Sequence, residues 1–197
     1  MWRNPVLSDT TSFVRLFFAL WPQEEVREQL AWLATRIADQ CGGRCVQPEN
    51  LHLTLAFIGQ IDRSIVPVLC QIGPAIHCTA FDLLLDRLHY WKKGNIISAG
   101  ISQPCPELVV LVQDLRNQFS AVGIRCDTVK FVPHVTLVRN VKQEPVQGYF
   151  PETIPPIAWT AIRWSLVQSR LTPHGPIYQS LADWVLASQD SDEHHRA

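Results

Sequence analysis

Two copies of one tetrapeptide constrain the fold of this chain more than any other feature. His52-Leu53-Thr54-Leu55 recurs as His134-Val135-Thr136-Leu137, and each copy lies in an aliphatic stretch, 51–58 and 131–138. Polar and apolar residues alternate in both stretches, which predicts half-buried β-strands. Because alternate side chains of a strand point to opposite faces, the histidine and the threonine of each copy share one face. The repeat therefore predicts two related halves that offer two imidazoles and two hydroxyls to one cleft.

The remaining pattern predicts an α+β domain with more strands than helices. Several expected strands follow one another through tight turns, which favours antiparallel sheets over a doubly wound parallel sheet. No flexible linker separates the two halves, so we expect two lobes of one domain, with the Pro-rich piece 149–156 as a surface connection and Gly59 at the end of the first motif strand. The other strands are expected at 12–20, 80–90, 96–101, 157–171 and 176–186, with helices at 22–41 and 107–122 and a broken helical stretch at 64–76.

Composition indicates one core and no extended contact with nucleic acid. With 197 residues, 47% hydrophobic and 18% charged, the chain can bury one substantial core, which we place at 13–187. The ends, 1–12 and 188–197, lack such a pattern and are expected to be flexible or disordered. The formal net charge of −1 argues against coating of long nucleic acid, so a nucleic-acid substrate would be bound at a local site such as a strand end.

The segment 13–21 is the longest apolar stretch near the N-terminus. It is interrupted by Arg15, is too short to span a bilayer and lacks the layout of a signal peptide. A cytoplasmic protein that does not enter a membrane is the expectation. Reduced thiols are therefore expected for the six cysteines, Cys41, Cys45, Cys70, Cys78, Cys105 and Cys126.

The sequence offers little for a metal site. Cys41 and Cys45 have no second cysteine pair or spaced histidine pair nearby to complete a zinc site. Glu49 is the only acidic residue within five positions of either motif histidine, so a carboxylate-bridged two-metal centre has little to build on. We expect chemistry without a metal or another cofactor.

The histidine pair suits cleavage of a phosphodiester. Such a reaction needs a base for the nucleophile and an acid for the departing oxygen on the opposite side of phosphorus, and histidine serves in either role near neutral pH. The hydroxyls of Thr54 and Thr136 can donate hydrogen bonds to the non-bridging oxygens. A 2′,3′-cyclic phosphate is an apt substrate because its ring strain reduces the stabilisation that the protein must supply.

Arg139 and two aromatic residues are further candidates for substrate binding. Arg139 is the nearest guanidinium to either motif, but strand parity directs it away from His134 unless a bulge or the strand end turns it back. An ordinary surface cation is the alternative for Arg139. Phe17 and Phe57, together with Phe131 and Trp91, could stack on a base, and core packing is the alternative for all four.

A histidine on a strand face is most often structural, and only the paired motif reverses that expectation. The five histidines outside the motifs are therefore expected to be structural or solvated; these are His77, His89, His174, His194 and His195.

These motifs resemble those of the 2H phosphoesterase superfamily, and within it the bacterial and archaeal RNA 2′,3′-cyclic phosphodiesterases, formerly called 2′-5′ RNA ligases. The likeness extends over RLFFAL (15–20), QPENLHLTLAFIG (47–59), FVPHVTLVR (131–139) and LVQSRLTPHGPIYQSLADW (166–184). The resemblance implies a bilobal fold of two antiparallel sheets with outer helices around a central cleft.

The resemblance also implies an activity and residue roles. The activity is metal-independent hydrolysis of 2′,3′-cyclic phosphate ends of RNA, tRNA fragments included, to 2′-phosphomonoesters, and the family's reversible joining of tRNA halves through a 2′-5′ bond can accompany it. His52 would be the proton donor and His134 the proton acceptor, while Thr54, Thr136 and Arg139 would hold the phosphate.

Two other functions stay open at this point. One is a non-catalytic module that binds RNA ends or 2′-5′-linked oligonucleotides in the same cleft. The other is a zinc hydrolase that uses histidine and cysteine ligands. In each case we expect a monomer without an obligate protein partner.

Overall fold

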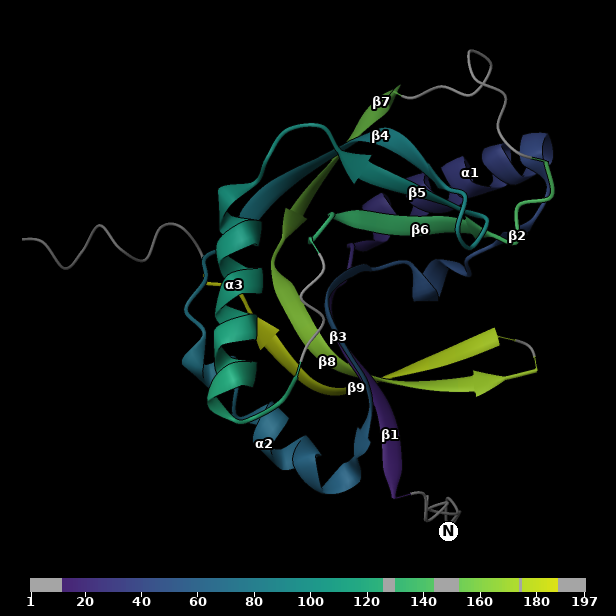
Figure 1. The fold of residues 1–197 in the computed structure, drawn as a ribbon. Coiled ribbons are helices and arrows are strands. Elements are labelled where there is room, and N and C mark those ends of the chain that lie inside the picture. Colours follow the sequence, from purple (N-terminus) through teal and green to yellow (C-terminus); the bar gives the residue numbers. More distant parts are fainter. Residues whose placement is uncertain (1–11, 126–129, 144–152, 174, 188–197) are drawn as a thin grey trace, which may run out of the picture.

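The computed structural model describes residues 12–125, 130–143, 153–173 and 175–187 (Figure 1). Outside these ranges lie nearly all of the two ends that we expect to be flexible, 1–12 and 188–197. The same holds for Cys126, His174 and the first part of the Pro-rich piece.

The described chain forms three helices and nine strands, and most of them match the expected ranges. The helices are α1 (Glu24–Cys41), α2 (Val66–Cys70) and α3 (Pro106–Ala121), with 3-10 turns η1 (Pro48–Asn50), η2 (Arg63–Ile65) and η3 (Gly73–Ala75). The strands are β1 (Phe13–Leu20), β2 (Arg44–Cys45), β3 (Leu53–Asp62), β4 (Phe81–Trp91), β5 (Ile96–Ile101), β6 (His134–Arg139), β7 (Thr153–Ala161), β8 (Arg163–Thr172) and β9 (Gly175–Val185).

All pairings between named strands are antiparallel, which confirms the α+β class. The strand order is β7-β4-β5-β6-β3-β1-β8-β9, and β2 pairs with the outer part of β6. The two four-stranded halves of this order form two lobes, but they belong to one sheet, and each lobe takes strands from both halves of the sequence rather than from one half as expected. A single residue pair, Leu53 with Val135, joins β3 to β6. Each of these residues directly follows a motif histidine, so the two motifs lie where the lobes meet.

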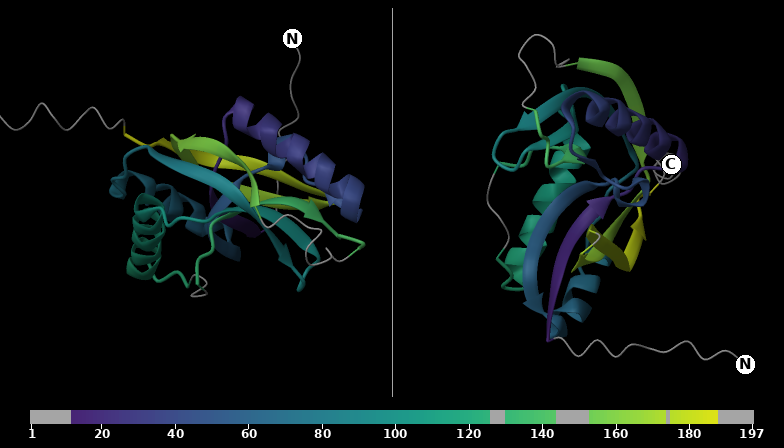
Figure 2. Two further views of the ribbon diagram at one scale, coloured as in Figure 1. Left: turned by 90° about the horizontal axis from the view of Figure 1, so that it is seen from above. Right: turned by 90° about the vertical axis from the view of Figure 1, so that its right-hand side faces the viewer.

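The two long helices are exchanged between the lobes. α1 follows β1 in the chain but contacts β2, β6 and β7 of the other lobe, whereas α3 follows β5 and contacts β3. On the α3 side, the rings of Phe18 and Phe119 lie 5.5 Å apart. Figure 2 shows α1 and α3 well apart, with strands between them. Buried residues of both helices belong to one continuous hydrophobic core.

The expected strand at 157–171 is wrong, because this stretch contains two strands in different lobes. β7 pairs with β4, and after Ile162 the chain crosses to β8, which pairs with β1. The sequence gives no turn signal there because Ile162 is apolar although 42% exposed. β7 also includes Pro155 and Pro156, which we expected in a surface connection. They are tolerated because β7 is an edge strand and both residues are exposed.

Gly59 does not end the first motif strand, which continues to Asp62. Its φ of 84° falls in the left-handed region, next to a register shift between Leu16 and Phe17 of β1. Glycine here therefore marks a β-bulge and not a strand terminus.

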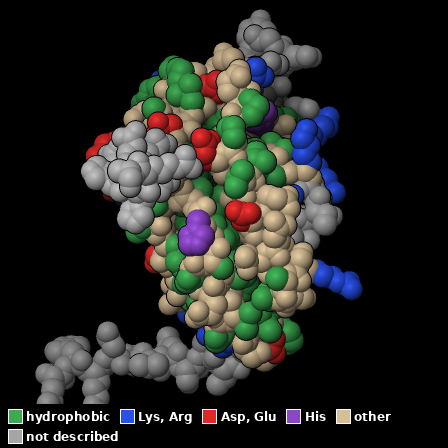
Figure 3. All heavy atoms as spheres, turned by 90° about the vertical axis from the view of Figure 1, so that its left-hand side faces the viewer, with side chains coloured by type: hydrophobic (Ala, Val, Ile, Leu, Met, Phe, Trp, Pro, Cys, Tyr) green, Lys and Arg blue, Asp and Glu red, His purple; other side chains and the backbone are tan. Residues whose placement is uncertain are grey.

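The visible surface around α3 shows no broad basic face. Figure 3 shows a mixture of hydrophobic, acidic and neutral side chains there, with the Lys and Arg side chains gathered towards one edge. In the part of the chain that the structure describes, no helix combines the length and the apolar character needed to cross a membrane.

Candidate active site

Both motif histidines are fixed to the backbone by the same device. Nδ1 of His52 lies 2.7 Å from the carbonyl oxygen of Asn50, and Nδ1 of His134 lies 2.8 Å from that of Val132. A carbonyl oxygen can only accept, so Nδ1 is the protonated nitrogen in each ring. Nε2 is thereby left to accept or donate a proton at a ligand.

One cavity brings the four predicted residues together. It has a volume of about 320 Å³ and is lined by His52, Thr54, His134 and Thr136, and also by Trp91, Lys93, Ile96 and Arg139. Two imidazoles and two hydroxyls thus face one space that can hold a phosphoryl group. A ring on either side of such a group can take a proton from a nucleophile and give one to a leaving oxygen.

A β-bulge turns Arg139 towards this cavity. The pairing of β5 with β6 joins Ser98 to Thr136 and Ile97 to Val138, so Leu137 has no partner in that register. Leu137 and Val138 are consecutive and both fully buried. The bulge reverses the parity of the strand, and Arg139 comes back to the face of Thr136. The alternative that the sequence left open, a bulge before Arg139, is the one observed.

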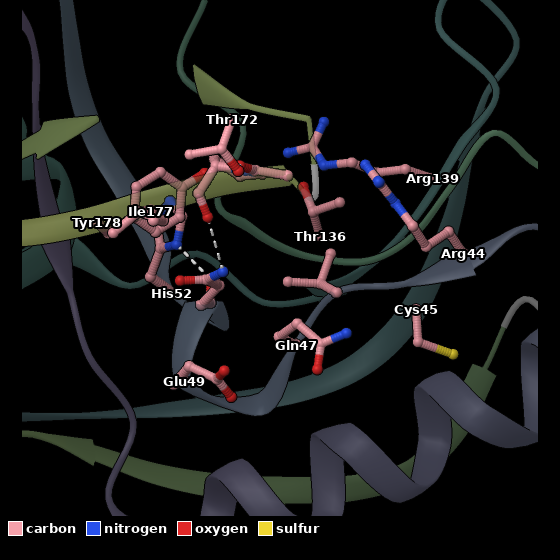
Figure 4. Close-up of a pocket in the computed structure, with 14 residues that line it drawn as sticks. Arg44, Cys45, Gln47, Glu49, His52, Thr136, Arg139, Thr172, Ile177 and Tyr178 are labelled. Carbon is pink, nitrogen blue, oxygen red and sulfur yellow. Dashed lines mark hydrogen bonds between the residues drawn. The ribbon is translucent and has the colours of Figure 1, made fainter. Parts of the chain in front are cut away.

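A second and larger cavity, of about 490 Å³, shares His52, Thr136 and Arg139 with the first. Its other walls come from η1, β2 and the hairpin of β8 and β9 (Figure 4). The side chain of Asn50 donates a hydrogen bond to the carbonyl oxygen of Pro176 at 3.2 Å and so ties η1 to the hairpin. Ile177 and Tyr178 supply apolar surface on the hairpin side.

Aromatic rings enclose the His52 imidazole. Phe17 stacks on it at 4.9 Å between ring centroids, while Trp21 and Tyr178 both lie at 5.2 Å, Tyr178 edge-on. This burial lowers the pKa of His52 from 6.5 to about 4, and the positive charge of Arg139 and the other imidazole act in the same direction. The bond to the Asn50 carbonyl opposes the shift in part. His52 is therefore neutral near pH 7 when no anion is bound.

His134 has fewer aromatic neighbours than His52. The one ring contact described for it is with Trp91, at 5.5 Å between centroids. Trp91 is itself oriented by a hydrogen bond of 2.8 Å from its Nε1 to the Oγ of the buried Ser98. The two histidines thus make the same kind of hydrogen bond to the backbone, but their surroundings differ.

The structure places Phe17 and Phe57 away from the walls of both cavities. Phe17 is only 4% exposed and supports the back of the His52 ring, which leaves no free face for a nucleobase. Phe57 is 43% exposed, but the guanidinium of Arg15 covers its ring at 4.9 Å. Direct stacking of a base on either ring is therefore not supported, and Trp91 and Tyr178 are the aromatic residues that line the cavities.

Several lining residues were not singled out as site residues from the sequence. Asn50 and Gln47 precede the first motif within the segment 47–59, and Tyr178 lies within the segment 166–184. Both segments carry the family likeness. Arg44 and Lys93 come from short loops and strands without a motif of their own. Only the pairing of β2 with β6 and the hairpin after Trp91 bring them to the cleft.

No metal centre is evident in the described part of the chain. Among these residues no group of three or more His, Cys, Asp or Glu side chains is placed to hold an ion. The five described cysteines are free thiols, of which Cys41 and Cys105 are buried.

Comparison with known proteins identifies the family. The model of the LigT-like phosphoesterase family matches residues 20–97 and, a second time, 100–178, so each match contains one His-x-Thr motif. The RNA 2′,3′-cyclic phosphodiesterase of Escherichia coli K12 is 33% identical over 159 residues, which cover 80% of this chain and 84% of that protein. The protein of the same name from Thermotoga maritima is 30% identical over 85% of this chain and 93% of its own length.

Solved structures agree with the sequence comparison. E. coli LigT in its apo form superposes with a TM-score of 0.77 at 31% identity, covering 90% of this chain and all of that one. The complex of E. coli LigT with 3′-AMP gives a TM-score of 0.79 at 29% identity, over 88% of this chain and 98% of the other. With both motifs at one cleft and two family matches over most of its length, the chain belongs to the LigT-like phosphoesterase family.

Proposed function

We propose that the protein is an RNA 2′,3′-cyclic phosphodiesterase that hydrolyses the cyclic end to a 2′-phosphomonoester without a metal ion. The observation that carries this proposal is the pair of histidines, each fixed through Nδ1 to a backbone carbonyl, that line one cavity with two threonines. The names of the E. coli and T. maritima relatives support the same activity.

The proposed reaction moves one proton at each side of phosphorus. His134 takes a proton from water through Nε2 as the water oxygen bonds to phosphorus. The bond between phosphorus and the 3′ oxygen breaks, and Nε2 of His52 gives its proton to that oxygen. Thr54, Thr136 and Arg139 stabilise the negative charge on the non-bridging oxygens. The product carries a 2′-phosphate and a free 3′ hydroxyl.

The depressed pKa of His52 fits the role of proton donor only if the bound substrate raises this pKa. A neutral His52 has no second proton to give, and its pKa of about 4 in the free protein keeps it neutral near pH 7. The bound cyclic phosphate carries a negative charge, which favours the imidazolium and raises the pKa again. Protonation of His52 is thereby coupled to the arrival of the anion.

A direct experiment is to incubate the protein with an oligonucleotide that ends in a 2′,3′-cyclic phosphate and to follow the phosphorus NMR spectrum. We expect the cyclic phosphate signal to be replaced by that of a 2′-phosphomonoester, with the same rate in the presence of EDTA. His52→Ala and His134→Ala should each abolish turnover. Tight binding of this end without product over hours would instead favour a binding module, and metal-dependent turnover would reject the metal-free scheme.

Further parts of the proposal concern the setting of the reaction. We take the protein to act as a monomer in the cytoplasm on RNA ends, without an obligate protein partner. Joining of RNA ends through a 2′-5′ bond is the same displacement at this phosphorus: the 5′ hydroxyl of a second RNA replaces water as the nucleophile, the bond to the 3′ oxygen breaks, and attack of that 3′ hydroxyl on the 2′-5′ linkage reverses the step. It can be measured with the same protein by supplying an RNA with a free 5′ hydroxyl.

A further inference from the structure

Two arginines face each other at the end of the larger cavity. Arg44 of β2 pairs directly with Arg139 of β6, so their Cβ atoms are about 4.5–5.5 Å apart on one face of the sheet. Both line the 490 Å³ cavity, and Figure 4 shows their side chains running alongside each other, across the pocket from His52 and Tyr178. Arg139 also reaches the 320 Å³ cavity, but Arg44 does not line it.

The local backbone is built to bring Arg44 to this position. Gly43 has a φ of 110°, and a Cβ atom there would lie 2.9 Å from the carbonyl oxygen of Arg139 and from a methyl group of Val138. Only glycine allows β2 to approach β6 so closely. On the opposite wall, Nη1 of Arg44 lies 4.0 Å from the position that a Cβ on Gly175 would occupy. The guanidinium thus spans the space between β2 and the β8–β9 hairpin.

The positive charge of this pair is not neutralised by the protein. In the part of the chain that the structure describes, neither Arg44 nor Arg139 makes an ion pair. Glu49 also lines the larger cavity, but it lies on the side away from the two guanidiniums (Figure 4). Two adjacent, uncompensated guanidiniums repel each other, and a bound anion relieves that repulsion. The pair is therefore an anion site that extends beyond the four motif residues.

We propose that Arg44 binds the phosphodiester that precedes the terminal nucleotide of an RNA substrate. This inference rests on the proposed function: with the cyclic phosphate between His52 and His134, the terminal nucleoside occupies the larger cavity against Tyr178. The next negative charge of the strand then lies on the 5′ side of that nucleoside, towards Arg44. A mononucleotide has no phosphate at this position. Arg44 thus makes the protein select the end of an RNA strand over a free cyclic nucleotide.

Three substrates and two variants test this assignment. The substrates are a nucleoside 2′,3′-cyclic phosphate, a dinucleotide with the same cyclic end, and that dinucleotide with an uncharged methylphosphonate as its internal linkage. For the unaltered protein we expect kcat/KM on the charged dinucleotide to exceed the other two by about tenfold, and this preference should weaken as salt is raised. Arg44→Gln should abolish this preference, so that kcat/KM on the charged dinucleotide falls about tenfold relative to kcat/KM on the mononucleotide.

Arg163→Gln is the matched control. It removes the same charge from an exposed residue at the opposite end of β8 that lines neither cavity, and it should keep the full preference. A circular dichroism spectrum and a thermal midpoint equal to those of the unaltered protein show that Arg44→Gln is folded. Equal rates of the unaltered protein on the charged and uncharged dinucleotides would overturn the assignment while leaving the proposed function intact. An equal loss for Arg44→Gln on all three substrates would also overturn it, because Arg44 would then act on the reacting phosphate. Absence of hydrolysis of all three would reject the proposed function itself.

Discussion

The two sides of the cleft are alike in sequence and backbone geometry but unlike in their surroundings. His52 and His134 each bond through Nδ1 to the carbonyl two residues earlier. Around His52, three aromatic rings exclude water and lower the pKa to about 4. Around His134, the described ring contact is with Trp91 alone.

This difference shows that a repeated motif does not by itself assign repeated roles. The His-x-Thr motif places an imidazole and a hydroxyl at the cleft, but the residues that pack against the imidazole decide when it is charged. Those residues come from β1, from Trp21 just after it and from β9 for His52, and from β4 for His134, far from either motif in the chain. The two imidazoles thus differ through their packing, although the repeat makes them alike.

The largest expected effect concerns the two histidines, whose roles can be distinguished by changing the leaving group of the substrate. On a cyclic phosphate end, His52→Ala and His134→Ala should each lower kcat by about 10³-fold, as expected for loss of a general acid or base. Bis(p-nitrophenyl) phosphate has a leaving group that needs no proton. On this substrate His52→Ala should lower kcat by less than about tenfold, whereas His134→Ala should still lower kcat by about 10³-fold. Release of p-nitrophenolate measures both rates.

His89→Ala provides a control for this comparison. His89 lies 6.2 Å from Trp91 but lines neither cavity, so its loss should change kcat by no more than about threefold. The reverse pattern, with His134→Ala rescued by the good leaving group, would exchange the two roles.

A second and smaller effect concerns protonation and stability. Folding lowers the pKa of His52 from 6.5 to about 4, so the unfolded chain binds more protons between these two pH values. The contribution of neutral His52 to stability is complete above pH 6.5 and is lost as pH falls towards 4. This loss amounts to about 3 kcal/mol. His52→Gln should flatten this part of the dependence of the unfolding free energy on pH, as measured by urea denaturation.

NMR titration of the imidazole gives the companion measurement. In the free protein His52 should titrate near pH 4, and addition of inorganic phosphate should raise its pKa because the anion favours the imidazolium. A free-protein pKa near 6.5 would contradict the desolvation of the His52 imidazole by its surroundings.

The smallest effect is expected at the threonines, where the two sides are most alike. Thr54 and Thr136 both line the 320 Å³ cavity and both are half-buried. Replacement by valine keeps the shape and removes one hydrogen bond to a charged oxygen, so Thr54→Val and Thr136→Val should each lower kcat/KM by about tenfold. Near-equal losses would confirm the symmetric role. A loss of 100-fold for one and none for the other would show that only one hydroxyl contacts the phosphate.

Much of this site is predictable from the sequence because the motif residues act within single strands. Alternation places His52 with Thr54 and His134 with Thr136, and the structure brings all four to one cavity. Arg139 is different, because its direction depends on a bulge at Leu137 that arises from pairing with β5. Strand periodicity alone cannot show where a neighbouring strand skips a residue.

The residues that the sequence does not reveal are those placed by long-range pairing. Arg44 reaches the cleft only because β2 pairs with β6, and Lys93 only because the hairpin of β4 and β5 brings it beside the motif residues. For the same reason the sequence does not reveal the crossing at Ile162 from β7 to β8. The two strands follow one half-buried pattern, and the change of pairing partner from β4 to β1 leaves no local signal. For Phe17 the sequence leaves stacking on a base and core packing open, and its position between β3 and β8 buries it behind His52.

The exchange of α1 and α3 between the lobes has a consequence for how such a protein can change. A break of the chain between the two family matches would separate α1 from β6 and β7, and α3 from β3, so we expect neither half to fold alone. The separation of the two imidazoles is therefore set by the folding of the whole chain. Damage to the packing of either helix should disturb both sides of the reacting phosphorus at once.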